Sequence, residues 1–212
     1  MIVVVGNPVA RAAVDGPALA AGLPVRVAIA AVAAAAAAQV VGRVGEDPAG
    51  EAALLDLARH GVGHAAILRD PSRPTPVLAA PGDDDALDAD GSSSEAALAA
   101  GASTLDAADL KLAFDYLPEY SVIVVAEPLA PATLAIAVGA AAWSGSALVV
   151  VGSGGLEGLP ENATVFEPPA DGDPDGAFAA MVGAYAAGLD RGEDPRAAFD
   201  AASQAVGSNA AS

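Results

Sequence analysis

Short runs of consecutive apolar residues alternate with longer, alanine-rich segments along most of the chain. Strands buried on both faces are predicted where β-branched residues follow one another without polar interruption: residues 2–5, 39–44, 122–125, 147–151 and 163–166. The longer segments predict helices at residues 27–38, 48–60, 107–116, 131–143, 175–189 and 195–206. Strands that alternate with helices are typical of an α/β domain with a mainly parallel sheet.

Turn and capping residues refine the middle of the chain. Asp47 and Pro48 predict the start of a helix, with Asp47 as the N-cap, and Gly61 predicts its end. Residues 65–69 and 76–80 predict a short hairpin because turn residues separate them.

Residues 83–94 are acidic and serine-rich, with one large apolar residue. We expect a flexible surface loop there, with no role in catalysis or sugar binding. The whole chain, residues 1–212, is predicted to form one domain around this loop.

The net charge and the cysteine content of the chain exclude some classes of function. A net charge of −18 argues against a nucleic-acid-binding surface, because phosphates would be repelled. The absence of cysteine excludes disulfides, zinc–thiolate sites and a thiol nucleophile. Such an acidic composition fits either a halophilic protein or a GC-rich genome, and composition does not separate the two.

No membrane or targeting segment is predicted. The longest apolar stretch, residues 27–38, is too short for a membrane span. The first residues lack the basic region of a signal peptide. We therefore expect a cytoplasmic protein.

One glycine-rich segment carries a recognisable motif. Residues 42–50 read GRVGEDPAG, and Gly61-Val62 follow after one predicted helix. This pattern resembles the PfkB family of carbohydrate kinases, which have a ribokinase-like fold. Further segments resemble the family in the same order: residues 21–28, 68–75, 162–168 and 176–202.

The resemblance implies a fold and a reaction. The fold would be a three-layer α/β/α sandwich, Rossmann-like, with a mainly parallel sheet and a lid that is reduced or absent in this shorter chain. The reaction would be transfer of the ATP γ-phosphate to a sugar or nucleoside hydroxyl, with ATP and Mg²⁺ as cofactors. The substrate side would include Asn7, Arg26 and Arg43.

The last signature of the family, D-T-x-G-A-G-D-A-F, is altered here. Residues 171–178 read DGDPDGAF, so the position of the catalytic Asp falls on Gly176, and Asp175 lies one residue away. In the family, backbone N–H groups at this helix start form an anion hole, which would involve Gly172, Gly176 and Ala177 here. Such an acidic helix start would repel a triphosphate.

Other family features are also missing. The sugar-binding Asp of the family would fall on Ala10 or Arg11. The N-x-x-E motif that helps to hold Mg²⁺ is absent, because Pro168 and Pro169 follow Glu167 in its place. The acidic segment 171–175 is expected to cap the helix that follows; a calcium loop is disfavoured because its twelfth position, Val182, is not Glu. No metal site is predicted.

Three interpretations of function follow. The first is a degenerate homologue, a pseudokinase, that acts in ligand binding or protein interaction. The second is an active small kinase that uses Asp175 as its base. The third is a structural subunit that pairs with an intact kinase or with a second copy of itself. A small sugar-like ligand is expected in the first two.

Overall fold

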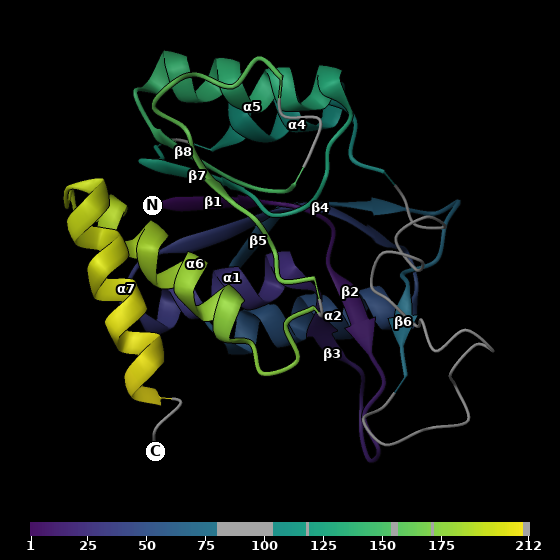
Figure 1. Cartoon of the computed structure of the whole chain (residues 1–212). Coiled ribbons are helices and arrows are strands. Elements are labelled where there is room, and N and C mark those ends of the chain that lie inside the picture. Colours follow the sequence, from purple (N-terminus) through teal and green to yellow (C-terminus); the bar gives the residue numbers. More distant parts are fainter. Residues whose placement is uncertain (80–103, 118, 154–156, 171, 210–212) are drawn as a thin grey trace.

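The computed structural model describes residues 1–79, 104–117, 119–153, 157–170 and 172–209. The predicted loop at 83–94 lies outside these residues. Figure 1 shows a central sheet with helices on both faces and a smaller sheet beside it.

The central sheet has six parallel strands in the order β5-β4-β1-β7-β8-β9. Every residue of β1 and β7 is buried, which explains their uninterrupted apolar sequences. The predicted parallel sheet is therefore confirmed. Its strands are β1 (Ile2–Val5), β4 (Ala38–Gly45), β5 (Gly63–Asp70), β7 (Val122–Val125), β8 (Ala147–Val151) and β9 (Thr164–Phe166).

Helices cover both faces of this sheet, giving three layers (Figure 1). Alternate residues of β1 point to opposite sides: Val3 packs in one apolar core with α4 (Ala107–Tyr116) and α5 (Pro131–Ser144). Ile2 packs in the other core with α1 (Leu23–Ala33) and α6 (Ala177–Asp190). On this second side lie also α2 (Pro48–Arg59) and α7 (Pro195–Asn209). Among the described residues, no helix combines the length and apolarity that a membrane crossing requires.

A second sheet of three short strands stands beside the first. Its order is β3-β2-β6, with β2 (Val9–Arg11), β3 (Leu19–Ala21) and β6 (Val77–Leu78). The sequence pattern did not predict β2 or β3, because three residues are too few to show a period. This sheet matches the expectation of a reduced lid.

The predicted hairpin of residues 65–69 and 76–80 is wrong. β5 pairs in parallel with β4 in the central sheet, whereas β6 pairs in parallel with β2 in the small sheet. β5 is an edge strand with mixed burial, and such alternation also suits a hairpin.

Two predicted helices start at the wrong residue. The helix expected at 27–38 runs over Leu23–Ala33, because Pro24 is tolerated in the first turn and Ala35 has a φ of +65° that ends the helix. The helix expected from Asp175 begins at Ala177, after Gly176 with a φ of +71°. The helix at 48–60 is confirmed as Pro48–Arg59: the Asp47 carboxylate accepts the Gly50 N–H at 2.7 Å.

Candidate functional site

The strand order reverses between β1 and β7. After β1 the chain adds β4 and β5 on one side, and it then crosses to β7, β8 and β9 on the other. In open α/β sheets, ligands bind beyond the carboxyl ends of the strands where the order reverses. The residues just after these strands, Asn7 and Glu127, are in contact there: Asn7 donates from its backbone N–H to Oε2 at 3.0 Å and from Nδ2 to Oε1 at 2.9 Å.

Glu127 is a carboxyl group at the edge of the apolar core. Burial raises its pKa, and the hydrogen bond from the Asn7 N–H only partly opposes this. A carboxyl group with a raised pKa beside a ligand crevice exchanges its proton closer to neutral pH than an ordinary Glu does.

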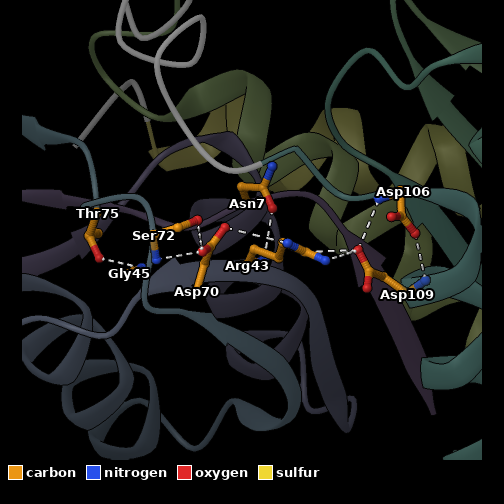
Figure 2. A network of polar contacts seen from close by, with 8 residues as sticks. All are labelled: Asn7, Arg43, Gly45, Asp70, Ser72, Thr75, Asp106 and Asp109. Carbon is orange, nitrogen blue, oxygen red and sulfur yellow. Dashed lines mark hydrogen bonds and ion pairs between the residues drawn. The ribbon is translucent and has the colours of Figure 1, made fainter.

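A polar network extends from Asn7 along the end of β4 (Figure 2). The backbone N–H of Arg43 donates to Asn7 Oδ1 at 2.7 Å. The Arg43 guanidinium lies between two carboxylates: its Nε and Nη2 are 2.8 and 2.6 Å from Asp109 Oδ2, and its Nη1 is 3.4 Å from Asp70 Oδ2. The network therefore joins β1, β4, β5 and α4 at one end of the sheet.

Electrostatics stabilise the ionised forms in this network. The hydrogen bond with Asp109 raises the pKa of Arg43 above its usual value, although burial of the guanidinium would lower this pKa. Burial would raise the pKa of Asp109, but the hydrogen bond and charge of Arg43 hold this pKa below its usual range. Asp70 also accepts from the Ser72 N–H at 2.8 Å, which fixes the turn after β5.

The glycine-rich motif at 42–50 packs against this network. A Cβ on Gly42 would lie 2.3 Å from the Gly6 carbonyl oxygen, and one on Gly45 would lie 2.5 Å from the Thr75 nitrogen. A Cβ on Gly50 would lie 2.4 Å from the Gly45 carbonyl oxygen. Each glycine therefore permits a close backbone approach that any side chain would prevent.

A second cluster surrounds the N-terminus of α6. The Asp173 carboxylate accepts the N–H groups of Phe178 and Ala179 at 2.9 and 3.0 Å. Arg26 donates from Nη1 to the Asp173 carbonyl oxygen at 2.5 Å, and the same nitrogen is 3.5 Å from Asp173 Oδ2. The helix N-terminus, a natural binding point for anions, is thus occupied by a carboxylate of the chain itself.

The structure groups the sequence-predicted substrate-side residues in two places. Asn7 and Arg43 belong to one network, whereas Arg26 joins the cluster at α6. Sequence reasoning did not single out Glu127 or Asp109. The signal for Glu127 was available, since it is the first polar residue after the buried strand at 122–125.

The predicted catalytic and anion-hole residues lie at the start of α6. Asp175 is exposed in the turn before the helix. Gly172 and Gly176 donate their N–H groups to the carbonyl oxygens of Pro169 and Asp173, at 3.1 and 3.2 Å. Ala177 is the first residue of α6 and is exposed.

The fit of ATP and Mg²⁺ to these residues is poor. Two N–H groups that could receive a phosphate already bind Asp173. Among the described residues, no group of three His, Cys, Asp or Glu side chains is arranged to hold a metal ion. In the part of the chain that the structure describes, the start of α6 therefore presents a carboxylate where a phosphate would bind.

Solved structures of sugar and nucleoside kinases share this architecture, whereas no family model and no curated protein matches the chain. Fructokinase from Vibrio cholerae O395 is 17% identical, with a TM-score of 0.66, over 97% of this chain and 95% of its own. Ribokinase from Arabidopsis thaliana, complexed with ribose and ATP, is 15% identical, with a TM-score of 0.66, over 97% and 90%. Aminoimidazole riboside kinase from Salmonella enterica is 14% identical, with a TM-score of 0.64, over 95% and 88%.

These proteins act on different substrates by name, so the shared feature is the architecture. The six parallel strands and the helices on both faces agree with the fold that the sequence motif suggested. The chain has the ribokinase-like fold of sugar kinases.

Proposed function

We propose that this chain is a degenerate carbohydrate-kinase homologue that binds a small, hydroxyl-rich ligand and transfers phosphate weakly or not at all. The ligand would bind at the carboxyl edge of the sheet, beside Asn7 and Arg43. The proposal retains a polar ligand site at this edge of the sheet, without the family's sugar-binding Asp, and gives up nucleotide binding. Cytoplasmic location and a single-domain organisation of residues 1–212 are part of this proposal.

The observation that carries the proposal is the Asp173 carboxylate at the N-terminus of α6. This carboxylate accepts hydrogen bonds from the backbone N–H groups of Phe178 and Ala179, at 2.9 and 3.0 Å. A phosphate would have to displace this carboxylate and would be repelled by it. Pro174, next to it, has no N–H to offer an incoming oxygen.

The ligand side supports binding of hydroxyl groups. Asn7, Asp70, Asp109 and Glu127 supply amide and carboxylate groups around Arg43 within one connected network. Carboxylates accept hydrogen bonds from hydroxyls, and an amide can donate as well as accept. The structure of ribokinase from Arabidopsis thaliana contains ribose and ATP. We propose that this chain binds a ligand similar to ribose.

The test is ligand-induced stabilisation combined with a turnover assay. We expect the melting temperature to rise with at least one of ribose, fructose and adenosine, and not with Mg-ATP. ADP formation should stay at background, because losing a general base alone typically costs 10²–10⁴-fold. A panel without any thermal shift would contradict ligand binding.

The same turnover assay also tests the alternative that the chain is an active kinase. Sugar-dependent ADP formation that Asp175→Asn abolishes and Asp194→Asn leaves intact would replace the proposal with the small kinase. Asp194 is a matched control because it precedes α7 and accepts the Arg196 N–H, far from this site in the sequence.

A further inference from the structure

A hollow of about 800 Å³ lies at the opposite edge of the central sheet. Its lining includes Ser121 and Trp143, which precede β7 and β8, so it opens at the amino edge. Phe114 and Tyr120 form part of its wall, with ring centroids 5.2 Å apart. None of these residues belongs to the candidate ligand site.

Trp143 is the most conspicuous residue of this hollow. It is the only tryptophan of the chain, and 88% of it is exposed. It sits near the end of α5, within a stretch from 128 to 156 that contains no charged residue. Tryptophan is enriched among the residues that anchor protein interfaces.

The charges beside Trp143 are acidic. Asp115 and Glu119 both line the hollow and are exposed. Asp115 is paired with Lys111 at 2.7 Å, whereas Glu119 makes no ion pair among the described residues. The Met1 ammonium, which also lines the hollow, is paired with Asp190 at 2.7 Å.

We propose that this hollow docks a basic segment of a different protein, with an Arg or Lys side chain against Trp143 and its charge facing Glu119. A cation over an indole ring is attracted by the ring quadrupole, and a nearby carboxylate adds to this attraction. A second copy of this chain fits less well: a symmetric contact would bring the same acidic rims together on two molecules that each carry −18. This proposal does not depend on the proposed function.

The sole tryptophan makes the proposal directly measurable. The probe is the peptide acetyl-Leu-Arg-Leu-Arg-Leu-amide, titrated into the full chain while Trp143 emission is recorded. We expect saturable quenching or a shift of the emission, and little change with the same peptide carrying neutral citrulline at both Arg positions. No saturable change up to millimolar peptide, or an equal change with the citrulline peptide, would overturn the proposal.

Two matched variants separate a docking site from general charge attraction. Glu119→Gln and Asp200→Asn remove one negative charge each, but Asp200 lies on α7, on the other face of the sheet. We expect Glu119→Gln to weaken peptide binding roughly threefold to fivefold and Asp200→Asn to leave it unchanged. If both variants lose the same peptide affinity, the peptide is attracted only by the net charge of the chain, and the proposed docking site is wrong.

Further measurements address the anchor residue and the second copy. Trp143→Ala should weaken binding of a fluorescently labelled peptide by more than roughly tenfold, as expected for an interface anchor, and unchanged binding would overturn its role. Emission that changes with protein concentration alone, together with a doubled mass on sizing, would assign the surface to a second copy and overturn the basic partner.

Discussion

Two glycine-containing segments near the carboxyl edge of the sheet behave in opposite ways. In residues 42–50, a Cβ on Gly42, Gly45 or Gly50 would meet backbone within 2.5 Å. At the start of α6, a Cβ on Gly172 or Gly176 would meet nothing within 4 Å. The first segment is confined by its neighbours, and the second is open.

The two segments, which resemble sequence motifs of the PfkB family, are therefore constrained by packing to different degrees. The motif at 42–50 is required for packing, so a substitution there would disturb the fold whether or not the protein has an activity. The segment before α6 has open space around its glycines, although Gly172 and Gly176 keep φ values of +77° and +71°, so packing constrains its residues less than those at 42–50. An intact packing motif therefore says little about catalysis.

The strongest test of this contrast is Gly42→Ala. Its Cβ would lie 2.3 Å from the Gly6 carbonyl oxygen, between two central strands that cannot easily separate. We expect a loss of about 3 kcal/mol or more in the free energy of unfolding, measured by denaturant titration.

Gly139→Ala is the matched control for this experiment. Gly139 lies inside α5 with nothing within 4 Å of its added Cβ, so alanine should stabilise the chain by about 0.5–1 kcal/mol. If Gly42→Ala lowers the free energy of unfolding by about 1 kcal/mol or less, residues 42–50 are not confined by their neighbours.

A second test removes the cation of the polar network. Arg43→Met leaves Asp70 and Asp109 partly buried without their shared partner, and we expect a loss of about 2 kcal/mol at pH 7. Arg69→Met, which breaks an exposed pair with Glu51, should cost less than about 0.5 kcal/mol. A similar cost for both would show that the network contributes no more than a surface ion pair.

The difference in stability between the wild-type chain and Arg43→Met should depend on pH. The pKa of Asp109 lies below its usual value of 3.8 in the wild-type chain, so its contribution to stability is present above that value and is lost as the pH falls through the lowered pKa. In Arg43→Met, burial without the guanidinium favours the protonated acid. The gap between the two proteins should therefore stay wide near neutral pH and shrink as the pH falls below 3.8, and a gap that stays constant there would contradict the role of Asp109.

The smallest effect is expected at the open segment. Asp173→Ala removes the carboxylate that holds two N–H groups of α6, and Asp194→Ala removes the one that holds the Arg196 N–H at α7. Each should cost about 1 kcal/mol. The Arg26 guanidinium lies 3.5 Å from the Asp173 carboxylate, so sulfate should restore more of the melting temperature in Asp173→Ala than in Asp194→Ala. Equal effects of sulfate would contradict a helix start suited to anions.

The central sheet could be predicted because its strands are buried on both faces. Residues 122–125 and 147–151 were predicted with their exact bounds, since continuous apolar runs have few alternative structures. The small sheet could not be predicted, because β2 and β3 depend on pairing between residues rather than on a local pattern. The position of β6 depends equally on its distant partner.

The candidate site could be predicted only in part, for a similar reason. The family resemblance of local segments led to both Asn7 and Arg43. Their contact at 2.7 Å depends on the parallel pairing of β1 and β4. The contribution of Asp109 comes from α4, across a chain separation that no local pattern spans. The acidic segment was expected to bind the N–H groups at the start of α6, as Asp173 does, whereas the pairing of Asp173 with Arg26 was not expected.

The central place of β1 has a consequence for synthesis on the ribosome. Its first partner, β4, follows soon in the chain, whereas Ile2 pairs on its other side with Val122. While the intervening residues are being made, a nascent β5-β4-β1 sheet would expose one edge of an entirely apolar strand. Open edges of this kind pair readily with other chains. The interval before β7 emerges is therefore the time when the growing polypeptide most needs a chaperone.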